Sequence, residues 1–297
     1  MSKARRFPKT AILIVNANSR KGAELFEIAR DKLAAAGIKL LEAKRVKSSK
    51  QIGRHVRQAI RRAPMVILGG GDGTLSENVD HFLGTKTVLG VLPFGTANSF
   101  ARTLGLPLDV DGAIEVIAGG NPRRIDLGAI AGDYFLNNAA LGLAPMVAES
   151  VPRTLKRTLG RLGYLLWAGW SAASFKAFLL SVHDGRATHR LWATEVRIAN
   201  GRFHGGVELV ESADLESGEL VVQAVIGRSV MKLGWSYLAS IFKVSSRHEG
   251  VREFRAPKIR IETKPRMRVS IDGELGPETP FDAWIVPNAI FVMAPQS

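Results

Sequence analysis

The residues with the clearest potential for chemistry stand in the stretch GGGDG, Gly69 to Gly73. It follows a short apolar run, Met65 to Leu68, of the kind that a buried parallel strand requires. Glycines have no Cβ, so the backbone can approach a ligand closely there. The residues Thr74 to Phe82 can form a helix whose first turn offers unpaired N–H groups and the positive end of its dipole. The pattern predicts an anion site.

Asp72 refines this interpretation, because a carboxylate among N–H groups would repel a bare phosphate. It is better placed beside a metal ion or a hydroxyl that awaits deprotonation, and phosphate together with a metal implies a nucleotide. The alternative is that GGGDG is only a tight turn, since Asp-Gly is a common turn dipeptide. The stretch fits neither GxxxxGK[ST] nor GxGxxG, so it predicts neither a P-loop nor a dinucleotide fingerprint.

Composition limits the classes of protein to consider. The chain has 297 residues, 46% of them hydrophobic, which is enough for two domains with a sizeable core. It has no cysteine, which excludes disulfides and thiolate chemistry and fits a reducing cytoplasm. The first apolar run has six residues and ends at Asn16, too short for a signal peptide, so we expect a cytoplasmic protein.

The formal net charge of +14 favours an anionic partner, either phospholipid, nucleotide or nucleic acid. The alternative for any one basic cluster is a solvated surface. No nucleic-acid-reading module is recognisable, so we expect no nucleic-acid partner.

The first half of the chain alternates strand-like and helix-like segments. Strands are expected at Thr10 to Asn16, Ile38 to Ala43, Met65 to Leu68 and Thr87 to Leu92, the first and third of them buried. A helix with Leu25, Ile28, Ala29 and Leu33 on its apolar face follows the first strand and stops at Gly37, and Ser48 or Ser49 caps a second helix. This order predicts an α/β domain with a parallel sheet covered by helices on both faces. Ligands bind beyond the carboxyl ends of such strands, where the loops NANSRKG, GGGDGT and PFGTANS would lie.

The pattern changes near Asp126. Apolar and polar residues then alternate with period two, for example from Thr194 to Ile198, from Ile259 to Glu262 and from Met267 to Ile271. We therefore predict a nucleotide-binding α/β domain over residues 1–128. A mainly antiparallel β-sandwich domain with a helical insertion is predicted over residues 129–297, with a cleft between the two domains.

The helical insertion is expected from Pro152 to Leu180 and carries basic residues followed by Tyr164, Trp167 and Trp170. Its apolar part is shorter than the roughly 20 residues that cross a bilayer. Two interpretations stay open. The segment could be an interfacial helix at an anionic membrane surface, or a helix packed on the second domain's sheet.

Six motifs occur in register along nearly the whole chain. They are GGGDGTLSE (Gly69 to Glu77), LPFGTANSFA (Leu92 to Ala101), RRIDLG (Arg123 to Gly128), NGRFHGG (Asn200 to Gly206), LESGEL (Leu215 to Leu220) and IDGE (Ile271 to Glu274). Together they resemble the bacterial branch of the diacylglycerol kinase catalytic family, which also includes sphingosine and ceramide kinases. The resemblance implies an ATP- and Mg²⁺-dependent kinase that phosphorylates the hydroxyl of a diacylglycerol-like or sphingoid lipid. It also implies a lipid-binding second domain and peripheral association with the membrane.

The resemblance assigns roles residue by residue. Its nucleotide-binding positions are Asn16, Ser19, Gly70, Gly71, Asp72, Gly73, Thr74, Glu77, Thr96 and Asn98. Ala17 and Arg20 depart from the family's usual NPxSG loop, and Ser99 stands where diacylglycerol kinase relatives usually have Asp. Asp126 and Glu274 match the family's catalytic acids, and Asp72 joins them. Asp214, Glu216 and Glu219 match the region of a structural Mg²⁺ site, although Ser217 replaces one Asp there.

The residues alone leave alternatives to these roles. Asp272-Gly273 can be only a hairpin turn with Glu274 on its exposed shoulder. Asp126 can be a strand-end residue or a cap. If the roles hold, Glu274 is the expected base, because burial in a cleft would raise the pKa of its carboxyl group toward a useful value. Asp72 and Asp126 are then expected to contact the metal ion or the acceptor hydroxyl.

Two other functions compete. A soluble NAD kinase-like enzyme would share GGDGT but has no need of a cationic, Trp-bearing helix. A nucleotide- or membrane-binding module that has lost catalysis would explain Ser99, Ser217 and the altered NANSRKG loop. A homodimer through an exposed strand of the second domain also stays open.

Overall fold

The first domain is built on a parallel sheet, as predicted. The computed structural model describes residues 9–142, 175–227 and 250–296. The sheet's strands are β1 (Thr10–Asn16), β2 (Lys39–Val46), β3 (Met65–Gly70) and β4 (Val88–Pro93), in the spatial order β2-β1-β3-β4. All three pairings are parallel. β3 and β4 are buried at every position, which explains their unbroken apolar sequence.

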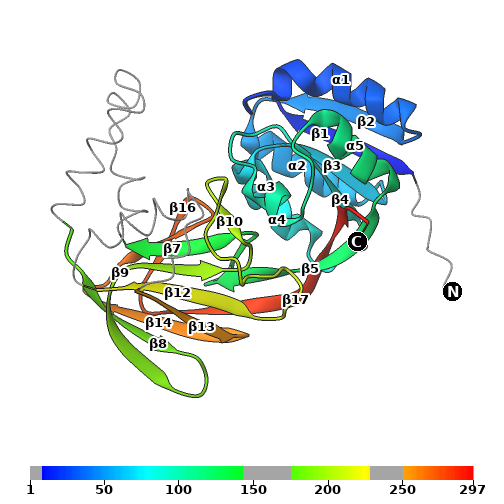
Figure 1. Ribbon diagram of the computed structural model, residues 1–297. Coiled ribbons are helices and arrows are strands. Elements are labelled where there is room, and N and C mark those ends of the chain that lie inside the picture. The colour runs from blue at the N-terminus through cyan, green and yellow to red at the C-terminus, as the bar shows by residue number, and fades with distance from the viewer. Residues whose placement is uncertain (1–8, 143–174, 228–249, 297) are drawn as a thin grey trace, which may run out of the picture.

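Helices cover both faces of this sheet (Figure 1). α1 (Gly22–Ala35) and α5 (Val110–Gly119) share one hydrophobic core with the sheet. α2 (Ser49–Ile60), α3 (Asp72–Val79) and the short α4 (Ser99–Thr103) share the other, and a 3₁₀ turn, Asp80–Phe82, extends α3. Of the two predicted N-cap residues, Ser48 holds that position in α2, although its side chain makes no capping hydrogen bond. The predicted apolar face of α1 was wrong at Ile28, which is 43% exposed, whereas Phe26 is buried.

The second domain is antiparallel. Its main strands are β7 (Asn138–Gly142), β8 (Phe178–His183), β9 (Thr188–Ala199), β12 (Leu220–Ile226), β13 (Val251–Ala256), β14 (Lys258–Lys264), β15 (Arg268–Ile271) and β16 (Glu274–Glu278). Every pairing among them is antiparallel. Shorter strands are β6 (Asp133–Phe135), β10 (Phe203–His204) and β11 (Val207–Glu208). Alternate residues meet in one core, which confirms the predicted sandwich.

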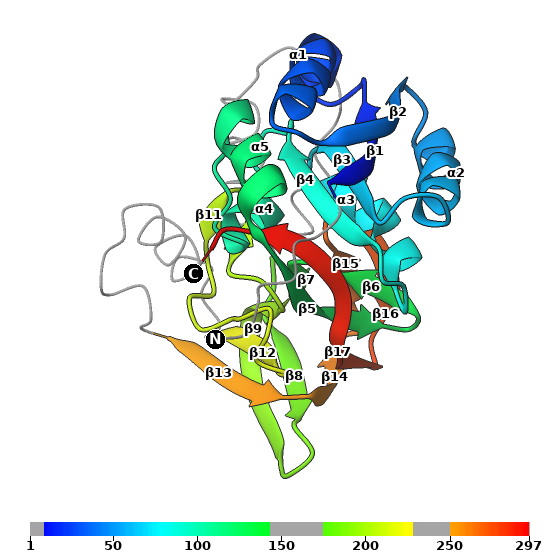
Figure 2. The ribbon, with the colours of Figure 1, turned by 90° about the vertical axis from the view of Figure 1, so that its right-hand side faces the viewer.

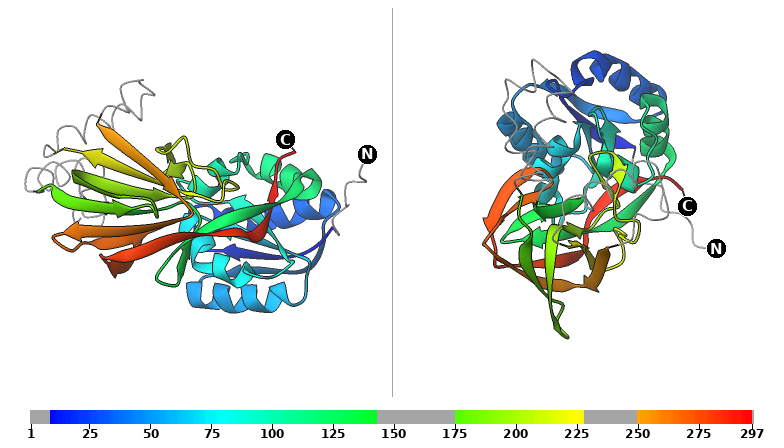
Figure 3. Two further views of the ribbon diagram at one scale, coloured as in Figure 1. Left: turned by 90° about the horizontal axis from the view of Figure 1, so that it is seen from below. Right: turned by 60° about the vertical axis from the view of Figure 1, so that its left-hand side comes forward.

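Two long strands join the domains (Figures 2 and 3). β5 (Asn121–Ile130) pairs along β17 (Phe281–Ala294). The last part of β17 also pairs in parallel with β4, through Phe291 and Val292. The predicted boundary at residues 128 and 129 therefore falls inside β5, and the chain's final strand belongs partly to the first domain's sheet. The prediction of a second domain over 129–297 needs this correction, because Ile290 and Val292 pack in the first domain's core.

The predicted helical insertion lies mostly outside the described residues. Its last three residues, Phe178 to Leu180, form the start of β8 rather than helix, since they pair with β9. Within the described ranges, no helix is both long enough and apolar enough to cross a membrane.

Candidate active site

Three loops meet at the carboxyl ends of β1, β3 and β4. The Asn16 Nδ2 atom donates to Thr74 Oγ1 over 2.8 Å, which ties the end of β1 to the start of α3. The Lys21 N–H donates to the Phe94 carbonyl at 3.3 Å, which ties the first loop to the third. The Ser19 hydroxyl turns back to the Asn16 carbonyl at 2.7 Å. The predicted nucleotide loops therefore form one continuous backbone surface.

Glycine is required where the second and third loops touch. A Cβ on Gly95 would lie 2.5 Å from the Gly71 Cα, and one on Gly70 would lie 2.6 Å from the Thr74 Cβ. A Cβ on Gly73 would meet nothing within 4 Å, so the backbone is open on that side. The contact brings the loops together and leaves the first turn of α3 accessible to a ligand.

Asp72 lies between two helix starts. It is the first residue of α3, and its Oδ1 atom accepts a hydrogen bond from the Phe100 N–H of α4 at 3.0 Å. Its Oδ2 atom has no hydrogen bond to the part of the chain that the structure describes. The carboxylate is thus fixed by one oxygen and keeps the other available for a metal ion or a hydroxyl.

The third loop gives Thr96 and Asn98 different positions. Thr96 is exposed at the tip of the loop. Asn98 is buried in a left-handed conformation, with φ 49°, and caps no backbone group of its own helix. Its amide instead accepts from the Gly95 N–H at 2.9 Å and donates to the Pro93 carbonyl at 3.1 Å. Asn98 therefore shapes the loop that presents Thr96.

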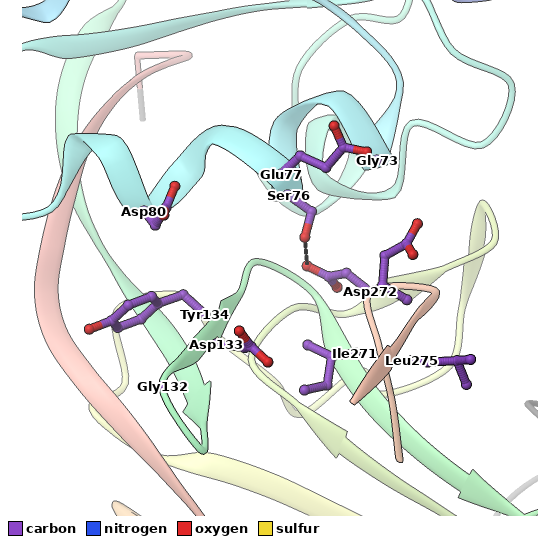
Figure 4. Close-up of a pocket in the computed structure, with 11 residues that line it drawn as sticks. Gly73, Ser76, Glu77, Asp80, Gly132, Asp133, Tyr134, Ile271, Asp272 and Leu275 are labelled. Atoms are coloured by element: carbon purple, nitrogen blue, oxygen red, sulfur yellow. Dashed lines mark hydrogen bonds between the residues drawn. The ribbon is translucent and has the colours of Figure 1, made fainter. Parts of the chain in front are cut away.

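A pocket of about 310 Å³ opens beside α3 and is lined by both domains (Figure 4). Gly73, Ser76 and Glu77 come from the first domain, while Asp272 and Glu274 come from the β15–β16 hairpin. Partial burial raises the pKa of Glu77, and the negative charge of Glu274 raises it further. The two carboxylates are therefore close enough to repel each other. Glu274 is exposed at the start of β16, as in the hairpin-shoulder alternative, so the burial expected for it is not found.

The donor set of this pocket fits Mg²⁺ that arrives with a nucleotide. Carboxylate oxygens are the ligands that Mg²⁺ prefers, and the ion usually takes one or two of them together with substrate phosphates and water. Glu77 meets that requirement. Over the described ranges, no three acidic, histidine or cysteine side chains form a ready-made metal site.

Asp272 is the site residue that the sequence did not identify, because it resembles an ordinary hairpin turn. Its Oδ1 atom accepts from the N–H groups of Asn137 and Asn138, at 3.1 and 3.0 Å. Its Oδ2 atom accepts from the Leu136 N–H at 2.8 Å and from the Ser76 hydroxyl at 3.0 Å. Burial raises the pKa of Asp272, whereas these four hydrogen bonds favour the carboxylate. The side chain joins α3 to the second domain and anchors the hairpin that carries Glu274.

Asp126 does not line this pocket. It is 3% exposed on β5, and its two carboxylate oxygens accept from the Gly218 N–H at 2.8 Å and the Asn288 N–H at 2.7 Å. Its own N–H donates to the Leu215 carbonyl. Asp126 therefore holds β5, the turn before β12 and the bulge of β17 in one place.

The three predicted ligands of a structural metal do not converge. The Asp214 carboxylate accepts from the Glu216 N–H at 3.0 Å, and the Glu216 side chain pairs with Arg123 at 2.6 Å. Ser217 donates to the Asp214 carbonyl at 2.9 Å and so closes the turn itself. Asp214, Glu216 and Glu219 lie in one turn, but their side chains form no shared ligand set.

Comparison with known families covers both domains. Residues 10–130 match the family model described as diacylglycerol kinase catalytic domain. Residues 138–294 match the model described as YegS C-terminal NAD kinase beta sandwich-like domain.

Several curated sequences and solved structures are similar to the chain. It is 30% identical to the "Probable lipid kinase YegS-like" of Chromohalobacter salexigens, over 78% of this chain and 76% of that protein. It is also 30% identical to a diacylglycerol kinase of Staphylococcus aureus, over 78% and 74% of the two chains. A crystal structure of a diacylglycerol kinase from Bacillus anthracis superposes with a TM-score of 0.76 at 21% identity, covering 97% of each chain. At 21% identity, this last similarity supports the fold alone.

Proposed function

Because the chain belongs to the diacylglycerol kinase family of lipid kinases, we propose that it transfers the γ-phosphoryl group of ATP, with Mg²⁺, to the hydroxyl of a diacylglycerol-like or sphingoid lipid. One observation carries the proposal. Glu77 follows the glycine loop and Glu274 comes from the other domain, yet both line one pocket. A phosphoryl transferase needs a turn that binds the phosphates, and it needs an acidic side chain close to the hydroxyl group that accepts the phosphoryl group.

The three loops would hold the triphosphate. The N–H groups at the start of α3 supply donors and a positive dipole end, and the open side of Gly73 gives phosphate access to them. Exposed Thr96 and the Asn16–Ser19 loop lie on the same surface. Arg20 and Lys21 are exposed on the first loop and offer positive charge for the phosphates.

Glu274 and Asp72 would act on the hydroxyl group of the lipid acceptor. In the transfer, a lipid hydroxyl oxygen forms the new bond to the γ-phosphorus, the bond from that phosphorus to the bridging oxygen of ADP breaks, and the hydroxyl proton passes to a base. Glu274 is the proposed base, and the free Oδ2 atom of Asp72 would orient the hydroxyl. Mg²⁺ would neutralise charge on the β- and γ-phosphates, with Glu77 as a carboxylate ligand.

Asp126 and the turn that carries Asp214, Glu216 and Glu219 have indirect roles in this proposal. Both Asp126 oxygens accept main-chain N–H groups, so its proposed role is to position β5 beside the site. A structural metal near Asp214, Glu216 and Glu219 stays a prediction. It would require main-chain oxygens, because the side chains lie apart.

The cytoplasm and the surface of an anionic membrane are the proposed location, in keeping with the net charge of +14. Sedimentation with anionic and with neutral vesicles tests this part of the proposal. Binding to the anionic vesicles alone is expected, and equal binding to both would contradict it. A homodimer is tested by light scattering of the purified protein.

The test of the activity is transfer of labelled phosphate from ATP, with Mg²⁺, to a panel of diacylglycerol, sphingoid and related lipids. The wild type should label at least one lipid, and Glu274→Gln should label it at least about a hundredfold more slowly. Arg62→Met, which removes an exposed ion pair with Glu42 remote from the pocket, is the control and should match the wild type. NAD is included as an acceptor, and formation of NADP without lipid labelling would overturn the proposal.

A further inference from the structure

A second pocket lies on the second domain and shares no lining residue with the proposed active site. Its volume is about 390 Å³, and it opens on the outer face of the sheet where β9, β8 and β14 run side by side. Three of its lining residues are cationic: Arg190, Lys264 and Arg266. Its acidic lining residue, Glu262, is already paired with Arg260 at 3.0 Å. The pocket therefore carries positive charge that its own wall does not compensate.

The three cations of this pocket differ from their neighbours in having no partner. They make no ion pair and no side-chain hydrogen bond with the part of the chain that the structure describes. Other cations of the same sheet are each paired with a carboxylate, namely Arg255, Lys258, Arg260 and Arg268. Like charges that gather without partners repel one another, so an anion bound among them would be stabilised.

Buried hydroxyl groups fix the turn that carries two of these cations. Thr263 and Thr279 are 6% and 1% exposed, and their Oγ1 atoms are hydrogen-bonded at 2.6 Å. The Met267 N–H donates to Thr279 Oγ1 at 3.1 Å, and the Thr279 N–H donates to the Met267 carbonyl at 2.9 Å. The turn from Lys264 to Met267 is thus tied to the segment before β17, so the backbone that presents Lys264 and Arg266 is held in place.

An exposed tryptophan stands beside the cations. Lys264 pairs with Leu179, and Leu179 pairs with Trp192, so the three residues form one row across β14, β8 and β9. Residues opposite each other on paired strands share a face of the sheet. Trp192 is 41% exposed on this face. Tryptophan is favoured at the head-group level of a membrane, and basic residues near it attract anionic lipids.

The pocket lies at the end of the second domain remote from the nucleotide loops. Pro280 lines it and directly precedes β17, whose other end pairs with β4 in the first domain (Figure 1). Arg266 precedes β15 and Asp272 follows it, so about 20 Å of extended chain separates the pocket from the anchor of the Glu274 hairpin. A molecule bound in this pocket therefore leaves the proposed active site open.

We propose that the three cations bind the phosphate group of an anionic phospholipid, while Trp192 enters the head-group layer of the membrane beside them. The inference rests on the membrane location proposed above and names the surface that makes the contact. A free phosphate ion would use the cations but would leave Trp192 in water, whereas a phospholipid in a bilayer engages both.

The test is sedimentation of the full chain, without ATP, with vesicles of phosphatidylcholine alone and of phosphatidylcholine mixed with phosphatidylglycerol. The site variant is Arg190→Gln/Lys264→Gln/Arg266→Gln. The control is Arg255→Gln/Lys258→Gln/Arg268→Gln, which removes the same charge from three exposed cations of the same sheet that have carboxylate partners. The Tm of each variant establishes that it is folded.

The site variant should bind the anionic vesicles about a hundredfold more weakly than the wild type, because each cation at an anionic surface contributes about a factor of five to the affinity. The control should lose less than about threefold. Equal losses in the two variants would overturn the inference, because they would mean that net charge alone attracts the protein to the membrane.

Two further measurements distinguish a phospholipid from free phosphate. Trp192→Ala should weaken binding to the anionic vesicles about tenfold. Leu41→Ala, which shortens an apolar side chain that is 44% exposed on β2, should leave the binding unchanged. Inorganic phosphate at constant ionic strength should not release the wild type from the vesicles. Release by phosphate, or no effect of Trp192→Ala, would refute the phospholipid site.

These outcomes are independent of phosphoryl transfer. If the wild type binds no vesicle, the proposed membrane location and this site are both wrong. If it binds anionic vesicles but the site variant and the control bind alike, the site alone is wrong. If binding follows the expectation while no lipid is phosphorylated, the proposed kinase activity fails and the phospholipid site is supported.

Discussion

At the scale of single residues, the account depends on the side chains that join α3 to the β15–β16 hairpin. Ser76 donates to Asp272 at 3.0 Å, and Asp272 in turn receives three main-chain N–H groups from residues 136–138. This arrangement sets the position of Glu274, two residues further along the chain. Ser76 is thus a positioning residue, because it acts on the proposed base through another side chain.

We predict that Ser76→Ala lowers kcat about five- to thirtyfold and changes the KM for ATP little, because a hydrogen bond to a carboxylate contributes about 1–2 kcal/mol to positioning. Steady-state kinetics measure both parameters. Ser212→Ala is a matched control, since Ser212 also donates to a carboxylate, that of Glu253 at 2.9 Å, but lies outside the pocket. Equal effects of the two substitutions would contradict the role of Ser76.

The Glu77 titration provides a second prediction. Partial burial and the charge of Glu274 both raise the pKa of Glu77, because each disfavours its carboxylate form. Glu274→Gln removes a negative charge, so the pKa of Glu77 should fall toward its ordinary value. NMR titration of the Glu77 carboxyl group measures the change. An unchanged pKa would mean that the two domains do not bring these residues together.

The sequence predicted some of these residues and missed others for physical reasons. Asn16 ends β1, and Asp72 and Thr74 lie in the first turn of the helix after β3, so the ends of parallel strands predict their meeting. Asp272 was missed because its partners lie 134–196 positions away in the chain, where no local pattern reports them. Glu195 and Arg197 are 2% and 6% exposed, yet the sequence shows them only as the polar half of an alternating strand, since period two gives a residue's face but not its burial.

At the scale of elements, Asp126 shows how a motif residue can serve the site from a distance. Its carboxylate holds three segments together: β5, the turn at Gly218 and the β17 bulge at Asn288. These contacts agree with the strand-end role that the residues alone left open.

We predict that Asp126→Asn lowers the free energy of unfolding by about 1–3 kcal/mol, because one of two buried N–H groups loses its acceptor. Denaturant unfolding measures the loss, and kcat at a temperature where the variant is folded should fall less than about tenfold. A loss of activity above a hundredfold without a loss of stability would instead establish a direct catalytic role for Asp126.

The regular elements were the most predictable part of the fold. β1 spans Thr10–Asn16 as predicted, and Ser48 at the N-cap position of α2 and Gly37 just after α1 agree with the local sequence. The return of β17 to β4 was not predicted, because pairs such as Phe291 with Val88 join residues that are 203 positions apart in the chain. For the same reason, the change of pattern near Asp126 marked a domain boundary that the structure places inside a strand.

At the scale of the whole molecule, β17 makes the two domains interdependent. One continuous sheet runs from β16 through β17 to β2 within the described residues. Removing the last strand would expose the edge of β4 and the core around Ile290 and Val292.

We therefore predict that residues 1–128 alone do not fold cooperatively, whereas the full chain does. Circular dichroism during thermal denaturation checks this, with a broad, weak transition expected for the fragment. A fragment that consists of residues 1–130 joined by a flexible linker to residues 281–297 should recover a cooperative transition. If residues 1–128 unfold sharply by themselves, β17 is dispensable for the first domain and the account of the shared sheet is wrong.

The central claim is that a nucleotide on the loops after β1, β3 and β4 faces an acid from the other domain. A crystal structure of the complex with Mg²⁺ and a non-hydrolysable ATP analogue tests it most directly. The account predicts phosphates at the N–H groups that begin α3, with the γ-phosphate between Gly73 and Glu274. Phosphates bound elsewhere, or a γ-phosphate that lies away from Glu274, would contradict it.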